Sequence, residues 1–311
     1  RQNHGCLLRI DGRPARHLMG ERILVIKLGA LGDIVLSLGP FAAIRDAHLD
    51  AQITLLTTAP YADFMEDSPY FNQIWIDIRP NITQPRTLLA LRHRLRNANF
   101  DFVYDLQTSD RSNWYYRLIG PGRRPNWSGI ATGCSHPHRN PDRDNMHTVD
   151  RQAEQLGLAG IERVSAADLS WLSTNIDKFE LGERYVLLAP GGATHRPEKR
   201  WPVNKFAALA CELASDGIEP VVLGGAQERE LAETIRAECS GARDLTGATS
   251  FADIASLAQN AAGAAGNDTG PMHLIAATGC PALVLFSAAS DPGLTQPRGP
   301  GVSVLKSEKL A

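Results

Sequence analysis

The sequence lacks the features that mark several large classes of protein. Its formal net charge is −2, so it has no basic excess of the kind that favours nucleic-acid binding. No apolar run approaches the ~20 residues of a membrane-spanning helix, and no signal peptide is evident. The five cysteines are odd in number and never spaced as CxxC, which favours a reduced, cytosolic compartment without structural zinc. We therefore expect no nucleic-acid partner and no metal site.

Two common nucleotide-binding fingerprints are also absent. Neither G-x-G-x-x-G nor G-x-x-x-x-G-K-[ST] occurs, so neither NAD nor a P-loop nucleotide is the expected ligand. What is present is a composition of 43% hydrophobic and 21% charged residues, which is ordinary for a globular protein. At 311 residues the chain is long enough for about two domains.

Strand-like and helix-like runs alternate along both halves. This predicts an α/β fold with two doubly wound, Rossmann-like parallel-sheet domains that face each other across a cleft. We expect these domains at 19–170 and 171–311, after a disordered lead-in at 1–18. The stretch 120–144, rich in Gly, Pro, Arg and Asn, is predicted to be irregular. The expected strands span 22–28, 52–57, 73–78, 100–106, 185–189, 220–223, 261–266, 282–286 and 302–305.

The end of the first predicted strand carries an acid. The aliphatic run 22–28 meets Gly29-Ala30-Leu31-Gly32-Asp33, and a helical pattern continues from 34 to about 48. Strand, glycine turn and helix open a doubly wound domain, in which ligands bind beyond the carboxyl ends of the strands. Asp33 has two interpretations, an acid that caps the helix or a general base that faces the cleft. The sequence leaves both open.

A second helix start, at Asn267–His273, has the composition of an anion site. Asp268 and Thr269 are both of the types whose side chains cap helices. Gly270 leaves the first turn without a side chain, so a ligand can approach the backbone, and Pro271 needs no N–H there. The free N–H groups and the helix dipole predict a bound anion, most commonly a diphosphate. A capped helix without a ligand is the alternative.

Three loops of the second half are expected to converge, because they leave the carboxyl edge of the same predicted sheet. They span 191–202, 224–228 and 268–273. Glu228 suits ribose hydroxyls, or is a solvated acid in a first helical turn. The side chains expected near a diphosphate leaving group are Thr194, Arg196, Lys199 and Thr269.

The basic residues of the first half lie either on solvated surfaces or against an acidic acceptor. Arginine suits phosphates or acidic sugars of a lipid-linked acceptor, because it pairs with them through two parallel hydrogen bonds. The residues concerned are Arg92, His93, Arg94, Arg96, Arg123 and Arg124, together with Arg111.

Three motifs resemble those of the ADP-heptose:lipopolysaccharide heptosyltransferases, which form glycosyltransferase family 9 and have the two-domain GT-B architecture. The motifs are Lys27–Asp33, Lys199–Pro202 and Asp268–His273, and the resemblance covers most of the chain. It implies that the first domain binds the acceptor and the second the nucleotide sugar. It also implies a catalytic base at Asp33 and a phosphate contact at Lys199. The remaining positions that it assigns to the nucleotide sugar are Thr194, Glu228, Asp268, Thr269, Gly270 and His273.

The resemblance implies an inverting, metal-independent transferase that uses no cofactor. The donor would be ADP-L-glycero-D-manno-heptose, and the acceptor a lipopolysaccharide inner-core sugar on a lipid-linked oligosaccharide. Asp33 would take a proton from an acceptor hydroxyl, which attacks the anomeric carbon opposite the diphosphate. The resemblance also implies a cytoplasmic protein, and it permits peripheral contact with the cytoplasmic face of the inner membrane.

The chain departs from the family pattern in ways that leave the acceptor open. Some of these enzymes carry a histidine shortly after the aspartate, where this chain has Leu36 and Ser37. The proline of Gly39–Pro40 also stands one residue late. The chain ends at Ala311 where family members continue, so we expect a terminal helix to be missing. Two alternatives remain, a GT-B transferase or epimerase that uses a UDP-sugar and a non-catalytic nucleotide-sugar binding module.

Overall fold

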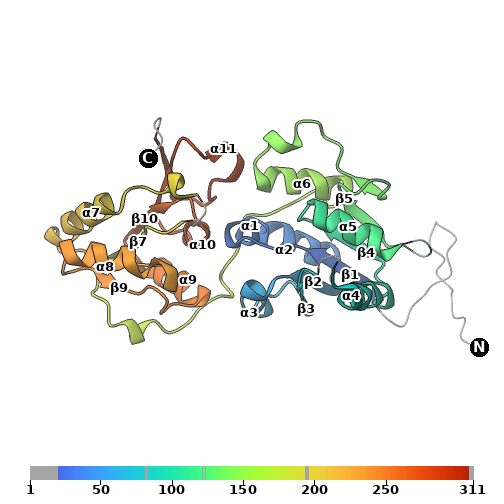
Figure 1. Ribbon diagram of the computed structural model, residues 1–311, viewed down its shortest axis with the longest axis horizontal. Helices are drawn as coiled ribbons and strands as arrows, with labels where there is room; N and C mark the ends of the chain where they lie inside the picture. The colour runs from blue at the N-terminus through green and yellow to red at the C-terminus, as the bar shows by residue number, and fades with distance from the viewer. Residues whose placement is uncertain (1–19, 81–82, 121, 123, 193–195, 308–311) are drawn as a thin grey trace, which may run out of the picture.

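The computed structural model describes residues 20–80, 83–120, 122, 124–192 and 196–307. The lead-in expected at 1–18 and the predicted site residue Thr194 therefore lie outside the described residues. The chain forms two α/β lobes that lie side by side (Figure 1). We call residues 20–158 the N lobe and residues 185–307 the C lobe. The segment 159–184 connects them, and the domain boundary at 170/171 stays a prediction.

The N lobe is built on a parallel sheet with the strand order β3-β2-β1-β4-β5-β6. The order reverses between β1 and β4, which are neighbours at the centre of the sheet. Ligands bind outside the carboxyl ends of strands at such a reversal, so the turn after β1 is a favourable position for a site. The strands are β1 (Arg22–Ile26), β2 (Gln52–Thr57), β3 (Gln73–Ile76), β4 (Phe102–Asp105), β5 (Asn126–Gly129) and β6 (His136–Pro137).

The C lobe repeats this topology. Its parallel sheet has the order β12-β11-β10-β7-β8-β9, which becomes 3-2-1-4-5-6 from the opposite edge when β7 is counted as the first strand. The N lobe has the same order, and here the reversal lies between β7 and β10. The strands are β7 (Tyr185–Ala189), β8 (Glu219–Val222), β9 (Arg243–Asp244), β10 (Gly263–Asn267), β11 (Ala282–Phe286) and β12 (Val302–Lys306).

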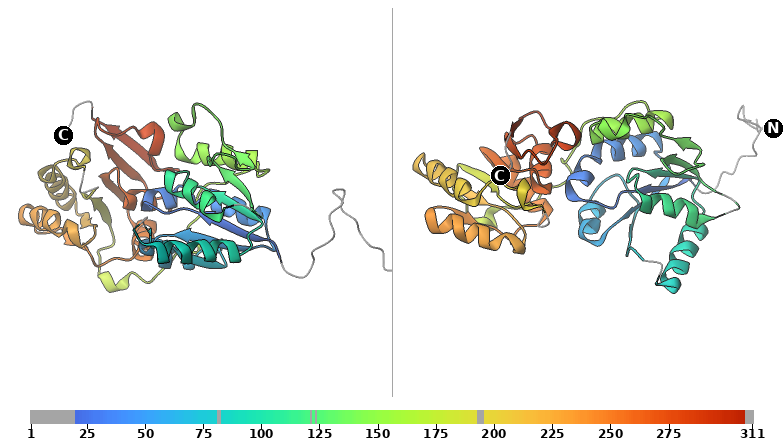
Figure 2. Two further views of the ribbon diagram at one scale, coloured as in Figure 1. Left: turned by 45° about the vertical axis from the view of Figure 1, so that its right-hand side comes forward. Right: turned by 45° about the horizontal axis from the view of Figure 1, so that its top comes forward.

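Helices connect the strands and pack against the sheets (Figure 2). Those of the N lobe are α1 (Leu31–Val35), α2 (Leu38–Ala47), α3 (Ala62–Glu66), α4 (Pro85–Asn97), α5 (Asp110–Ile119) and α6 (Thr148–Leu158), with short 3₁₀ turns η1 (Ala59–Tyr61) and η2 (Arg143–Asn145). Between the lobes lies η3 (Asp177–Phe179). Those of the C lobe are α7 (Val203–Ser215), α8 (Arg229–Glu238), α9 (Phe251–Asn260), α10 (Gly270–Ala277) and α11 (Pro292–Thr295), with η4 (Pro197–Lys199) and η5 (Ala226–Glu228).

Two predictions about the N lobe are wrong in detail. The helix expected from 34 to 48 is divided into α1 and α2 at Leu36 and Ser37. The stretch 120–144 is not wholly irregular, because β5 and β6 extend the sheet there. Both strands are short, and only the fully buried Trp127 supplies a large apolar side chain to β5. A pattern search needs longer apolar runs than these.

The strand predicted at 261–266 is confirmed by β10, although alanine and glycine are poor strand formers. This strand lies between β7 and β11, and its small residues follow from that crowded position. A Cβ atom on Gly266 would lie 2.7 Å from both the Ala189 Cβ and the Met272 sulfur. Packing therefore selects glycine here against its low strand propensity.

The two lobes meet through their helix starts and through aromatic side chains. A Cβ on Gly32 would lie 2.7 Å from the His273 ring, and one on Gly270 would lie 2.8 Å from the Leu31 Cβ. The beginning of α1 thus packs directly on the beginning of α10. To one side, the Phe64 ring lies 5.5 Å from the Phe251 ring between centroids. Figures 1 and 2 show α1 and α10 adjacent at the junction of the lobes.

Candidate functional site

Asp33 lies near the start of α1, at the junction of the lobes. Its Oδ2 accepts a hydrogen bond of 3.2 Å from the Ala30 N–H, so the carboxylate does cap the helix. The side chain nevertheless remains 39% exposed. The cap contact uses one oxygen and leaves acceptor capacity on the carboxylate. The two interpretations of Asp33 are therefore compatible, and its role as a base stays a prediction.

Lys27, at the end of β1, is a neighbour of Asp33 to which the sequence motif assigned no role. Its side chain is only 4% exposed, and its Nζ lies 3.9 Å from Asp33 Oδ1. The same ammonium donates to the Leu106 carbonyl at 3.3 Å. Burial lowers the pKa of Lys27, while the Asp33 and Asp105 carboxylates oppose that shift. The signal in the sequence was a lysine at the end of an otherwise aliphatic buried strand.

At the start of α10, the side chains do not cap the helix as expected. Thr269 is the N-cap residue, but its side chain accepts no hydrogen bond from the helix. The Asp268 carboxylate instead lies 3.4 Å from Lys199 Nζ and 3.9 Å from His273 Nε2. A lysine ammonium is a stronger attractor for a carboxylate than a backbone amide is. The first turn of α10 is thus left without a side-chain cap, which suits an external anion.

Asp268, Lys199 and His273 form a largely buried polar group, which we call the C-lobe cluster. Burial alone would raise the pKa of Asp268, but the nearby His273 ring and the charge of Lys199 lower it overall. The His273 side chain is 7% exposed, and its Nδ1 has no hydrogen-bond partner among the described residues. The cluster contains a fixed cation beside the uncapped helix start.

Gly270 has a structural reason that we did not expect. The space where its side chain would extend is filled by Leu31 of the N lobe. Its lack of a side chain therefore permits the contact between lobes, and the approach of a ligand to the backbone here stays a prediction.

Two of the three loops expected to converge, 191–202 and 268–273, are tied together by Asn267, a residue whose role sequence reasoning missed. Its Oδ1 accepts from the Trp201 N–H at 2.8 Å, and its Nδ2 donates to the Pro190 carbonyl at 2.8 Å. This buried amide joins both ends of the loop that carries Lys199 to the end of β10. A single Asn in a motif cannot reveal such partners, which lie about 70 residues away.

Glu228 is buried, so the interpretation as a solvated first-turn acid is wrong. Its Oε2 accepts from the Gly225 N–H at 2.7 Å. A Cβ on Gly191 or on Gly224 would lie 2.7 Å from the carbon atoms of Glu228. Glycine at both positions lets this carboxylate lie between the first two loops.

Arg196 has contacts within the same lobe. It donates to Glu198 Oε1 at 3.2 Å and to the Ala289 carbonyl at 3.0 Å. It therefore joins the η4 loop to the loop that follows β11. No distance places it beside Asp268, so its contact with a diphosphate stays a prediction.

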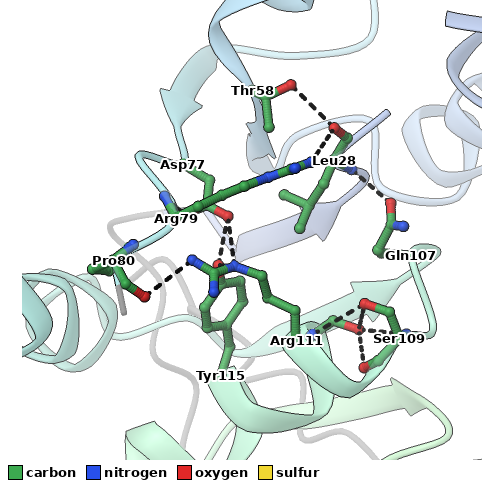
Figure 3. Close-up of polar contacts among 10 residues, drawn as sticks. Leu28, Thr58, Asp77, Arg79, Pro80, Gln107, Ser109, Arg111 and Tyr115 are labelled. Atoms are coloured by element: carbon green, nitrogen blue, oxygen red, sulfur yellow. Dashed lines mark hydrogen bonds and ion pairs between the residues drawn. The ribbon is translucent and has the colours of Figure 1, made fainter. Parts of the chain in front are cut away.

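On the N-lobe side, Arg111 belongs to a polar group at the carboxyl ends of the strands (Figure 3). Its Nε donates to the Tyr115 hydroxyl at 2.8 Å, and its Nη2 donates to the Pro80 carbonyl at 3.2 Å. Tyr115 in turn donates to the fully buried carboxylate of Asp77. Arg79 extends across the group and donates to the Leu28 carbonyl at 3.5 Å. We call Asp77, Arg79, Arg111 and Tyr115 the N-lobe cluster.

Several other basic residues of the first half have structural contacts. Arg94 stacks on the Trp75 ring at 3.9 Å, and Arg96 donates to the Ile119 carbonyl. Arg124 donates to the Gly120 carbonyl and stacks on Tyr116. Arg123 lies outside the described residues. Since these arginines brace α4, α5 and the loop that follows, they are weaker acceptor candidates than Arg111.

Among the described residues, no group of three or more His, Cys, Asp or Glu side chains could hold a metal ion. Likewise, no helix in the described ranges is both long and apolar enough to cross a membrane. The absence of a metal and of a cofactor from the reaction stays a prediction.

The family described as glycosyltransferase family 9 (heptosyltransferase) matches residues 88–310, more than half of the chain. The chain belongs to this family. It is 33% identical over 306 residues to the lipooligosaccharide heptosyltransferase 2 of Haemophilus ducreyi, covering 89% of this chain and 86% of that protein.

Two solved structures extend the comparison to the fold. The Escherichia coli ADP-heptose lipopolysaccharide heptosyltransferase II superimposes with a TM-score of 0.73 at 24% identity, covering 91% of this chain and 90% of the other. The E. coli heptosyltransferase WaaC with ADP gives 0.72 at 21% identity, covering 92% and 93%. The predicted GT-B architecture is confirmed, and family membership makes the chain a glycosyltransferase.

Proposed function

We propose that this glycosyltransferase moves a heptose from ADP-heptose to a sugar of the lipopolysaccharide inner core, with inversion and without a metal. The observation that carries the proposal is the contact between α1 and α10. Gly32, which precedes Asp33, packs on the ring of His273. A candidate base of one lobe and a candidate anion site of the other are therefore brought to one junction, as a displacement between two substrates requires.

The C lobe is proposed to bind the donor. Lys199 and the uncapped first turn of α10 would stabilise the negative charge that grows on the departing diphosphate. Asp268 would repel a diphosphate directly, so we assign it the task of holding Lys199 and His273 in place. The names of the two E. coli structures support ADP as the nucleotide, since one is an ADP-heptose enzyme and the other contains ADP.

The N lobe is proposed to supply the base and to bind the acceptor. Asp33 accepts the proton of an acceptor hydroxyl while the oxygen of that hydroxyl forms a bond to the anomeric carbon. The bond between the anomeric carbon and the diphosphate breaks on the opposite side. Arg111, 28% exposed and fixed by Tyr115, would pair with a phosphate or carboxylate of the acceptor. The acceptor sugar itself is left to experiment.

The test is an assay with ADP-heptose and a panel of inner-core acceptors, with product mass as the readout. We expect one added heptose on at least one acceptor, in the presence of EDTA as well as without it. In a parallel calorimetric titration, ADP should bind more tightly than UDP. A clear preference for UDP, or transfer from a UDP-sugar alone, would contradict the proposed donor.

A further inference from the structure

The proposed reaction assigns no role to Lys27, the buried lysine that directly follows β1. Lys27 is 3% exposed, and its ammonium has the Leu106 carbonyl at 3.3 Å and the Asp33 carboxylate at 3.9 Å. Removing an ammonium from water is costly unless the charge is paired and hydrogen-bonded. An apolar residue would fit this position equally well, since the buried residues of β1 directly before it are all aliphatic. A buried charge at this position therefore indicates a function other than packing.

The geometry around Asp33 indicates what that function is. One carboxylate oxygen accepts from the Ala30 N–H, and the other lies nearest to Lys27. The carboxylate is thus held from two directions, while 39% of the side chain remains open toward the outside. A base that is fixed in this way needs little reorganisation when a hydroxyl arrives.

The chain between these two residues is also anchored, so that their separation is set by the fold. The Leu28 N–H donates to Gln107 Oε1 at 2.8 Å, and the Leu28 carbonyl accepts from Thr58 Oγ1 at 3.1 Å (Figure 3). Gly29 follows with φ of +113°, a conformation that side chains rarely allow. The turn is therefore held by neighbouring strands on both sides of β1.

We propose that Lys27 is a positioning residue for the transfer, whose ammonium holds the Asp33 carboxylate in the orientation that faces the acceptor hydroxyl. The inference rests on the proposed function only in that Asp33 acts as the base. It requires neither ADP nor heptose as the donor.

Other charges face this pair and enter any dependence on pH. Asp105 on β4 and Arg151 on α6 act on Lys27. The charge of Asp33 acts on Tyr61 of η1, and the His273 ring on α10 packs against Gly32. Burial raises the pKa of Asp105 to about 6, although hydrogen bonds from Thr108 and the charge of Lys27 oppose this. Loss of Lys27 would remove one of the cationic groups that act on the buried Asp105, so stability must be measured beside activity.

The experiment is a double-mutant cycle of Lys27→Met and Asp33→Asn. Methionine matches the lysine stem in length and removes the ammonium, that is, the charge and the hydrogen bond to the Leu106 carbonyl. We expect K27M to lower kcat about 100-fold, as small misplacements of a reacting group can do. The ADP dissociation constant should stay within about twofold of the wild type, so that the loss falls on kcat and not on donor binding. In the D33N background the same change should cost nothing more, because its target is already absent.

Two results would overturn the inference. One is a K27M enzyme with unchanged kcat. The other is a double variant slower than D33N by the same factor that separates K27M from the wild type, which would indicate a purely structural role. If K27M does not fold, Lys27→Arg, which keeps the cation, must retain most of the kcat of the wild type. If the wild type transfers a sugar from a UDP donor instead, the proposed donor fails and the cycle is run with that donor.

Discussion

The two helix starts that meet between the lobes each carry an aspartate, and they use it in opposite ways. Asp33 lies inside the first turn of α1, with its side chain 39% exposed and one buried ammonium at 3.9 Å. Asp268 precedes α10, is 10% exposed, and lies between Lys199 and His273. An accessible carboxylate with free acceptor capacity can take a proton. A buried carboxylate between a lysine and a histidine holds those two side chains in place and is not accessible to a substrate hydroxyl.

The largest expected effect comes from removing the accessible carboxylate. Asp33→Asn should lower kcat by about 10²- to 10⁴-fold, the usual contribution of general-base catalysis. The ADP dissociation constant should be unchanged, because Asp33 belongs to the other lobe. Steady-state kinetics and calorimetry on the same preparation provide both values. Turnover within threefold of the wild type would remove Asp33 from the mechanism.

The next effect tests the contact between the helix starts. Gly32→Ala would put a Cβ at 2.7 Å from the buried His273 ring, so the two lobes must shift apart. We expect kcat to fall about 10- to 100-fold through misplacement of Asp33 relative to the donor. Gly157→Ala is the matched control, because a Cβ there has nothing within 4 Å. The control should be neutral or stabilising by about 0.5–1 kcal/mol. Equal activity of the two variants would refute the role given to this contact.

A smaller effect is expected from the cation that Asp268 holds. Lys199→Ala should weaken ADP binding about 10-fold, because a charge-assisted hydrogen bond contributes about 1.5–3 kcal/mol. Calorimetric titration with ADP and with adenosine separates the cause, since adenosine lacks the diphosphate. Adenosine affinity should not change. An unaltered affinity for ADP would show that Lys199 does not contact the phosphates.

The smallest effect concerns stability and pH. The folded-state pKa of Asp268 lies below its unfolded value, so its contribution to stability is present above about pH 4 and is lost as pH falls through the folded pKa. Asp268→Asn should therefore unfold a few degrees below the wild type at pH 7, and the difference should shrink below pH 4. Glu233→Gln, at an exposed position of α8, is the control and should change little. A difference in unfolding temperature that is constant with pH would contradict the assignment.

Much of the fold followed from apolar periodicity. The strands β2, β7 and β11 have the predicted bounds because each is a run of aliphatic residues that ends at polar or turn residues. The two-residue strands β6 and β9 were not predicted, because they are too short to show a pattern. Their pairing depends on the neighbouring strand rather than on their own residues.

The sequence predicted several residues of the candidate site but not the contacts between them. Motifs identified Asp33, Lys199 and Asp268, because acidic and basic residues at helix starts can be recognised from the sequence alone. The roles of Lys27 and Asn267 depend on which backbone lies opposite them after folding. The reason for glycine at position 270 likewise depends on the other lobe. Such information arises only when distant segments pack together.

The most direct test of the central claim is the stereochemistry of the product. If the Asp33 carboxylate faces the diphosphate site across the junction of the lobes, the acceptor oxygen attacks from the side opposite the leaving group. Proton NMR of the product of ADP-heptose transfer should then show an anomeric configuration opposite to that of the donor. A product that retains the configuration of the donor would contradict the account.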